Sequence, residues 1–101
     1  MKQQFLVVFE VGKTSFGASA PDIPGCFAVG PTLDETRLRF LEAVEAHLEW
    51  LASDHDPIPR PVTTAYDFSR EPGEDASSYF VEWLTISVPA EARQAVSATA
   101  Q

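Results

Sequence analysis

Residues 21–35 read PDIPGCFAVGPTLDE and place two tight turns, a short extended segment and a helix start in one stretch of chain. The first two prolines fix their own φ angles and favour extended conformations in the residues before them. Gly25 and Gly30 stand where we expect a positive φ or the close approach of another backbone segment. Thr32 and Glu35 have the spacing of a capping box at a helix N-terminus. The segment therefore predicts turn, strand, turn and helix in that order.

Alternating hydrophobicity predicts an antiparallel meander of three strands around this segment. In the first strand, apolar residues share one parity: Phe5, Val7, Phe9 and Val11. Gly12-Lys13 fits a two-residue hairpin turn. The second strand carries small or aromatic residues on one parity: Phe16, Ala18 and Ala20. A short third strand is predicted over residues 26–29, which completes the meander.

A long amphipathic helix is predicted from Leu33 to about Ser53. At 100° per residue, its apolar side chains gather on one face: Leu33, Phe40, Leu41, Val44, Leu48 and Leu51. Its acidic side chains gather on the opposite face: Glu35, Glu42, Glu45 and Glu49. Arg37 falls on the apolar face, so we expect its charged end to extend to water near the helix start. The helix is thus predicted to pack on the strands with an acidic stripe outward.

Prolines end this helix. Residues 56–61, DPIPRP, are predicted to continue as a stiff extended connector. A short edge strand is then predicted over residues 62–68, followed by a polar turn over residues 69–78.

The last strand is predicted over residues 79–88, where Glu82 is the single charged residue on the apolar parity. We expect residues 1–90 to form one domain, because a chain of this length supports a single core. Residues 91–101 are weakly helical and are predicted to form a short frayed tail.

Charge and composition narrow the class of protein. The chain has 101 residues, with 15 acidic and 7 basic side chains and a net charge of −8. The basic residues are scattered, whereas nucleic-acid binding requires clustered phosphate contacts, so direct DNA or RNA binding is not expected. The apolar run of residues 5–9 is too short for a signal-peptide core or a membrane span. A single cysteine excludes an internal disulfide, and we expect a cytoplasmic protein that does not contact membranes.

No motif of catalysis or metal binding stands out. Asp54-His55-Asp56 has ligand-type side chains, but three consecutive residues cannot all converge on one ion, so we interpret them as a polar loop that ends the helix. His47 is interpreted as a half-buried helix residue and Cys26 as a buried thiol. A Cys26–His47 dyad would require His47 to turn toward the strands, which its helix angle does not favour. The sequence therefore predicts a protein that is not an enzyme and uses no cofactor or metal.

Four blocks of sequence, in order and spacing, resemble the HicB antitoxin family. They are PDIPGCF with the following Gly30, TLDE at 32–35, EAV at 42–44 and PIP at 57–59. The resemblance covers about residues 3–62, with a compatible last strand. It implies an α+β domain, described as a partial RNase H-like fold, with a three-stranded antiparallel meander, one long amphipathic helix and a returning strand.

The resemblance also implies a function. Family members bind and neutralise a small basic ribonuclease toxin, HicA, by covering its active site, and the resemblance implies a homo-oligomer, either a dimer or a tetramer. Many carry a C-terminal segment that binds their operator. Residues 84–93 have only a faint likeness to the start of a ribbon-helix-helix, without its second helix, so operator binding is not expected here.

For the contact with the toxin, we consider acidic residues that would complement positive charge and turn residues that would make a shaped contact: Asp22, Ile23, Pro24, Gly25, Phe27, Glu35, Glu42, Glu45 and Glu49. An acidic helix face is also the ordinary solvated face of a soluble protein. Three alternatives stay open. They are a self-associating HicB-like domain without a toxin, which an apolar patch at Trp50 or Trp83 would favour; an operator-binding transcriptional regulator; and a small hydrolase using Cys26 or residues 54–56.

Overall fold

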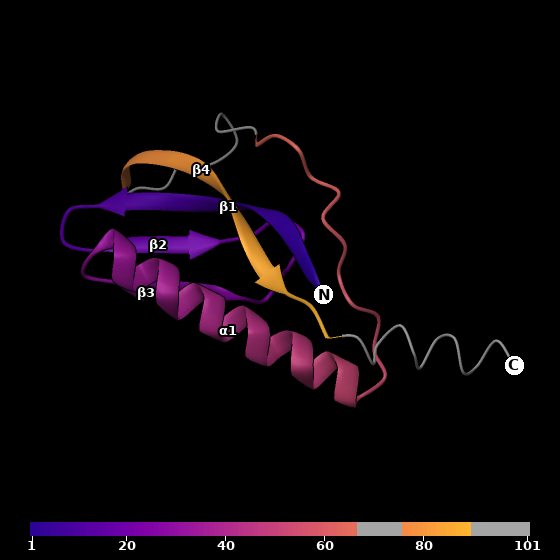
Figure 1. Ribbon diagram of the computed structural model, residues 1–101. Helices are drawn as coiled ribbons and strands as arrows, with labels where there is room; N and C mark the ends of the chain where they lie inside the picture. Colours follow the sequence, from indigo (N-terminus) through magenta and orange to yellow (C-terminus); the bar gives the residue numbers. More distant parts are fainter. Residues whose placement is uncertain (67–75, 90–101) are drawn as a thin grey trace, which may run out of the picture.

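One antiparallel sheet and one helix make up the fold (Figure 1). The computed structural model describes residues 1–66 and 76–89. Its elements are, in chain order, β1 (Lys2–Gly12), β2 (Phe16–Ser19), β3 (Phe27–Gly30), α1 (Leu33–Ser53) and β4 (Ala76–Ser87). The strand order is β3-β2-β1-β4, and every neighbouring pair is antiparallel. The predicted α+β architecture, a meander followed by a helix and a returning strand, is confirmed.

The turns of the meander differ in detail from the prediction. Residues 13–15 separate β1 from β2, so the connection is longer than a two-residue hairpin. It is closed by the Gly12 N–H, which donates to the Ser15 carbonyl over 2.9 Å. β3 begins at Phe27 and ends at Gly30, one residue later than predicted at each end.

The core lies between the sheet and α1, which runs along one side of the sheet in Figure 1. Its largest fully buried side chains come from both layers: Phe5, Val7 and Phe9 of β1, and Phe40, Val44 and Leu48 of α1. Phe80 of β4 extends this layer, because its ring stacks on Phe9 with centroids 5.1 Å apart. Burying each such side chain contributes about 1.5–3 kcal/mol, so this layer supplies most of the stability.

The other face of β1 is buried as well. Leu6 is 2% exposed and Val8 is 3% exposed, although alternation predicts one buried face only. Their neighbours across the β1–β4 ladder are Trp83 and Val81, which are 47% and 36% exposed. The central strand is therefore apolar on both faces, whereas the adjacent edge strand keeps apolar side chains accessible to solvent.

Helix α1 has the predicted bounds, and its ends are stabilised by local hydrogen bonds. Thr32 Oγ1 accepts from the Glu35 N–H over 3.1 Å, which is one half of the predicted capping box, while the Glu35 carboxylate pairs with Arg39. At the C-terminus, the N–H groups of residues 54–56 bond back to carbonyls of the last turn, and His55 adopts a φ of 60°. This confirms that Asp54-His55-Asp56 is the loop that ends the helix.

Gly30 allows the end of β3 to lie against the first turns of α1. A Cβ at this position would lie 2.6 Å from Thr36 Oγ1 and 3.0 Å from the Thr36 nitrogen. Thr36 itself is fully buried, and its hydroxyl donates to the Thr32 carbonyl over 2.7 Å. The predicted close approach at Gly30 is therefore confirmed.

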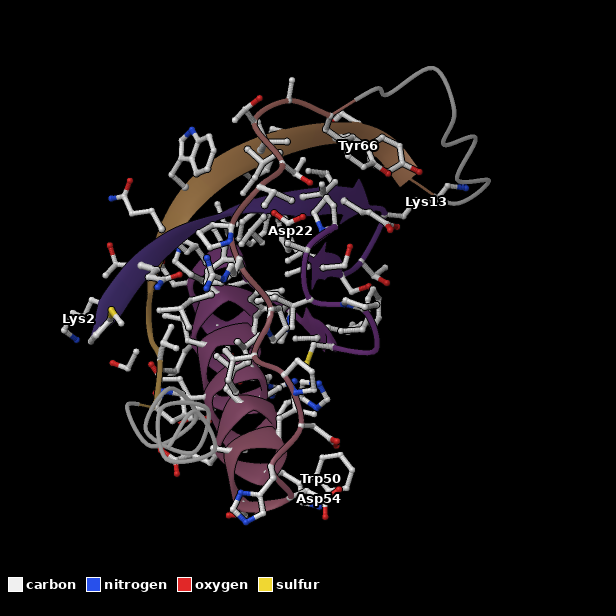
Figure 2. All side chains as sticks on the ribbon, turned by 90° about the vertical axis from the view of Figure 1, so that its right-hand side faces the viewer. Lys2, Lys13, Asp22, Trp50, Asp54 and Tyr66 are labelled. Atoms are coloured by element: carbon white, nitrogen blue, oxygen red, sulfur yellow. The ribbon has the colours of Figure 1, made fainter. Side chains whose placement is uncertain are left out.

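Residues 57–66 are extended but do not form the predicted edge strand. They rise from the end of α1 to the side of the sheet opposite the helix (Figures 1 and 2). β4 begins at Ala76, three residues before the predicted start of the last strand. The predicted polar turn over residues 69–78 falls mostly in residues 67–75, which lie outside the described part of the chain. The predicted tail over residues 91–101 also lies outside the described residues.

Candidate partner-binding surfaces

The β2–β3 loop contains four of the predicted contact residues: Asp22, Ile23, Pro24 and Gly25. The loop turns tightly because the Ile23 N–H donates to the Ala20 carbonyl over 3.1 Å. Gly25 has a φ of 92°, a left-handed value that confirms the expected need for glycine. Pro24 and Gly25 are exposed. Ile23 is fully buried in the core cluster, so the prediction that it contacts a partner is corrected: its side chain anchors the loop from below.

Asp22 also has a structural role. Its Oδ2 accepts from the N–H groups of Val62 and Thr63 over 2.9 and 2.8 Å, and its Oδ1 accepts from Thr63 Oγ1 over 2.7 Å. Figure 2 shows Asp22 beside the segment that follows α1. Hydrogen bonds to a carboxylate are about twice as strong as neutral ones, so this side chain is committed to holding residues 62–63 on the loop. This also explains why no edge strand forms there.

Phe27 is the exposed aromatic residue of the loop region. Its side chain is 56% exposed, and a Cβ on Gly17 would lie 3.3 and 3.4 Å from Phe27 Cζ and Cε1. The ring therefore rests on the bare backbone of β2. Because Ala28 is buried on the α1 side and strand side chains alternate, Phe27 lies on the face opposite α1. Val29, 44% exposed, lies on the same face.

The four acidic helix residues predicted as contacts differ in how their carboxylates are used. Glu35 accepts from Arg39 over 2.7 Å, and Glu45 accepts from the Ser87 N–H over 3.3 Å. Glu42 and Glu49 are exposed and make no ion pair or hydrogen bond within residues 1–66 and 76–89. They lie seven residues apart, which places them on one helix face about 10 Å from each other along the axis. These two carboxylates remain available to a basic partner.

The predicted residues therefore divide into two surfaces. The Phe27 surface consists of Pro24, Gly25, Phe27 and Val29. The acidic surface consists of Glu42 and Glu49. The sheet separates them, because Phe27 faces away from α1 and the two glutamates lie on the solvent side of α1. A partner that contacts both surfaces must extend around an edge of the sheet.

One ion pair was not expected from the sequence. Arg37 binds Glu82 of β4 with both arms of its guanidinium, Nε to Oε1 over 3.0 Å and Nη2 to Oε2 over 2.8 Å, and its Nη1 reaches Asp34 Oδ1 over 2.9 Å. The guanidinium also lies 5.7 Å from the centre of the Phe9 ring. The pKa of Arg37 is raised, chiefly by its hydrogen bond to Glu82. Arg37 thus closes one end of the core instead of extending freely to water.

The residue types suited to catalysis are in unreactive surroundings. Cys26 is buried, and burial raises the pKa of its thiol, which disfavours the nucleophilic thiolate. His47 is half-buried and stacks on Trp50, with ring centroids 6.3 Å apart. Over residues 1–66 and 76–89, no three His, Cys, Asp or Glu side chains are grouped closely enough to hold a metal ion. In the same part of the chain, α1 is not apolar enough to cross a membrane.

Two solved structures share the fold. The N-terminal domain of the antitoxin HicB from Burkholderia pseudomallei superimposes with a TM-score of 0.55 and 23% identity, over 86% of this chain and 99% of that one. A chain from a HicA3–HicB3 toxin–antitoxin complex gives a TM-score of 0.58 and 21% identity, again over 86% of this chain and 99% of that one.

Similar sequences cover part of the chain. An uncharacterised 14.9 kDa protein of Haemophilus phage HP1 is 35% identical over 54 residues, which are 54% of this chain and 41% of that protein. The UPF0150 protein ssr1765 of Synechocystis is 33% identical over 45 residues, 45% of this chain and 57% of that protein. The alignments thus span about half the length of these relatives. A family model described as the HicB-like antitoxin of bacterial toxin–antitoxin systems matches residues 5–96, and the chain therefore belongs to the HicB-like antitoxin family.

Proposed function

We propose that this protein is an antitoxin that binds and neutralises a small basic ribonuclease toxin of the HicA type, and that it has no catalytic activity of its own. The observation that carries the proposal is its membership of the family, together with a fold shared with a chain from a HicA3–HicB3 complex over 86% of its length. Inhibition by a protein of this kind requires a surface that covers the toxin, with no bond-breaking groups.

Charge supports a basic partner. The net charge of −8 attracts a basic protein at long range and raises the rate of encounter. Glu42 and Glu49 offer carboxylates without internal partners among the described residues, whereas Glu35 and Glu45 are already hydrogen-bonded. We assign the electrostatic part of the contact to the acidic surface and the apolar part to the Phe27 surface.

The charged contact is tested with two variants that change the net charge by the same amount at different places. The variant E42Q/E49Q and the control T14K/T64K both raise the net charge by two, the control at exposed sites away from α1. Because close charge pairs contribute more than the overall field, we expect E42Q/E49Q to weaken binding of the co-expressed basic ribonuclease about tenfold. The control should weaken it much less. Titration calorimetry with the ribonuclease encoded beside the gene measures the dissociation constant of each variant.

Growth of cells expressing that ribonuclease gives a second measurement. The wild-type chain should relieve the growth arrest, and E42K/E49K should not. If the two chains rescue growth equally, the acidic surface is not the contact. If even the wild-type chain neither binds the ribonuclease nor restores growth, the proposed function fails.

The apolar part of the contact is tested with two alanine variants, one on the Phe27 surface and one outside it. Phe27→Ala removes an aromatic side chain that is 56% exposed, and Val62→Ala removes a branched side chain that is 73% exposed. Buried aromatic anchors dominate binding energy at protein interfaces, with losses above about 1 kcal/mol on truncation. We therefore expect Phe27→Ala to weaken toxin binding at least tenfold and Val62→Ala to leave it unchanged. Equal affinities for the two variants would exclude the Phe27 surface.

A further inference from the structure

The face of the sheet opposite α1 has buried apolar side chains of its own. Leu6 and Val8 of β1 are 2% and 3% exposed, yet they do not belong to the core cluster between the sheet and α1. Because side chains alternate along a strand, they point away from the face that carries Phe5, Val7 and Phe9. An antiparallel sheet commonly leaves its second face to water, so the burial of Leu6 and Val8 requires a cover.

Residues 57–66, which we call the strap, lie on that side of the sheet (Figures 1 and 2). The strap is attached near the end of α1 by Ile58, which packs against the core cluster. Further along, the Asp22 carboxylate accepts from the N–H groups of Val62 and Thr63 and from the Thr63 hydroxyl. Residues 57–65 make no other hydrogen bond to the described part of the chain. One side chain therefore provides all the hydrogen bonds that hold these residues.

The same side chain belongs to the loop that carries the Phe27 surface. Ile23, the next residue, is buried in the core cluster and donates its N–H to the Ala20 carbonyl. Within residues 1–66 and 76–89, residues 24–26 make no hydrogen bond. The position of this exposed part of the loop therefore depends on the two residues before it. One of them is packed in the core, and the other is fastened to the strap.

We propose that the Phe27 surface binds the toxin only while Asp22 holds the strap in place, which makes Asp22 and Thr63 positioning residues for that contact. The inference rests on the proposed function and adds a conformational requirement to it. In the bound arrangement the strap also shields Leu6 and Val8. When the strap is released, the loop loses its three hydrogen bonds to residues 62–63, and these two side chains lose cover on the face where Phe27 projects.

This arrangement couples the strap to toxin binding. When only the molecules with an attached strap bind, the measured dissociation constant rises in inverse proportion to their fraction. By thermodynamic reciprocity, a bound toxin favours the attached strap to the same extent. A substitution in the strap therefore weakens toxin binding even where its side chain does not touch the toxin.

Two substitutions of Asp22 separate this role from a direct charge contact with the toxin. In Asp22→Asn the amide oxygen can accept from both N–H groups, and the amide nitrogen can donate to the Thr63 oxygen, since a hydroxyl both donates and accepts. Asp22→Ala makes none of these bonds. Both variants raise the net charge by one, so a difference between them reports the hydrogen bonds and not the charge.

Nuclear magnetic resonance of the purified chain measures whether the strap stays attached. The methyl signals of Leu6 and Val8 should shift toward their unfolded values in Asp22→Ala, because their cover is lost. In Asp22→Asn they should stay close to those of wild type. Circular dichroism verifies that both variants keep α1 and the sheet. If the methyl signals of Asp22→Ala coincide with those of wild type, Asp22 does not hold the strap over this face and the proposal is wrong.

Titration calorimetry with the ribonuclease encoded beside the gene measures the effect on binding. Asp22→Ala should raise the dissociation constant at least about tenfold, which requires that fewer than about a tenth of the molecules keep the strap attached. Asp22→Asn should stay within about threefold of wild type, because its neutral hydrogen bonds are weaker than those of the carboxylate.

A second pair of variants moves the test to the strap itself. Thr63→Val removes the hydroxyl and keeps both N–H groups, so its dissociation constant should lie between those of wild type and Asp22→Ala. Thr63→Ser should restore wild-type binding, and Thr64→Val, at the adjacent exposed position, should not change it.

The outcomes distinguish this inference from the proposed function. If wild type binds no ribonuclease, the proposed function fails and the inference fails with it. If wild type binds and Asp22→Ala binds equally well, the inference alone is wrong. If Asp22→Asn weakens binding as much as Asp22→Ala does, Asp22 acts on the toxin through its charge, which also overturns the inference.

Discussion

Two arginines of α1 contact the two edge strands of the sheet, and the contacts differ in kind. Arg39 donates from Nη1 to the backbone carbonyl of Val29 in β3 over 2.8 Å. Arg37 binds the side chain of Glu82 in β4. Arg39 therefore occupies an acceptor that a neighbouring strand would need, whereas Arg37 binds a side chain and no backbone group of β4. Side chains of α1 thus occupy one backbone group on each edge strand, the Val29 carbonyl of β3 and, through Glu45, the Ser87 N–H near the end of β4.

The two edges also differ in length and in how they are held. β3 has four residues and lies against α1 through Gly30, whereas β4 has twelve and is paired with β1 along its length. Short, covered edges resist pairing with other chains, and long open ones promote it. The comparison shows that the β3 edge is short and lies against α1, whereas the β4 edge is long.

The largest effect is expected at the β3 contact. Gly30→Ala places a methyl group within 2.6–3.2 Å of Thr36 atoms, two of which belong to the helix backbone and cannot rotate away. Overpacking of this kind costs about 2–3 kcal/mol of unfolding free energy. Urea denaturation at a fixed protein concentration measures this loss of unfolding free energy. Val29→Ala, next along the strand but 44% exposed, should cost less than about 1 kcal/mol. Equal stability of Gly30→Ala and wild type would show that β3 is not held tightly against α1.

A smaller effect is expected from the two arginines, and it should be unequal. Arg37 and Glu82 are 27% and 31% exposed at their side chains, whereas Arg39 and Glu35 are 50% and 45% exposed. Arg37→Met keeps the apolar stem but leaves Glu82 without its cation, which we expect to cost about 1–2 kcal/mol. Arg39→Met should cost about 0–0.5 kcal/mol.

A double-mutant cycle with Glu82→Gln isolates the Arg37–Glu82 coupling from the loss of the arginine itself. A coupling energy near zero, or a larger loss for Arg39→Met than for Arg37→Met, would contradict the ranking of the two contacts.

The smallest effect concerns Cys26, which precedes β3 and reports on whether that edge opens. Because burial raises the pKa of the thiol, the folded chain keeps it protonated at a pH where the unfolded thiol is ionised. Its contribution to stability is complete below the ordinary thiol pKa of about 8.5 and is lost as the pH rises toward the folded value. Labelling with a disulfide reagent at neutral pH should therefore be slow. Fast labelling of folded wild type would indicate an open β3 edge.

Most of the fold was predictable because its signals are local. The helix bounds, Thr32 as the N-cap and the special backbone positions of Gly25 and Gly30 follow from residue type and spacing within a few residues. The burial of Leu6 and Val8 did not follow from alternation, since it depends on what covers the second face of the sheet.

The candidate site was predicted less well, for a physical reason. Asp22 looks like a surface acid in sequence because its hydrogen-bond partners, Val62 and Thr63, lie forty residues away. Arg37 and Glu82 were each recognised as charges on an apolar face. Opposite charges on buried faces of two elements are expected to meet, so these two anomalies together were a signal for the ion pair that binds α1 to β4.

The carboxylate of Asp22 makes the shape of the β2–β3 loop depend on a distant part of the chain. An isolated peptide with the sequence of residues 21–30 would lack this restraint, and so would a fragment ending at the last turn of α1. Mimics of the Phe27 surface for inhibitor design must therefore include residues 62–63 or replace the three hydrogen bonds they make. Loss of the Thr63 hydroxyl, or a proline at either position, would remove hydrogen bonds to Asp22 without changing any residue of the loop.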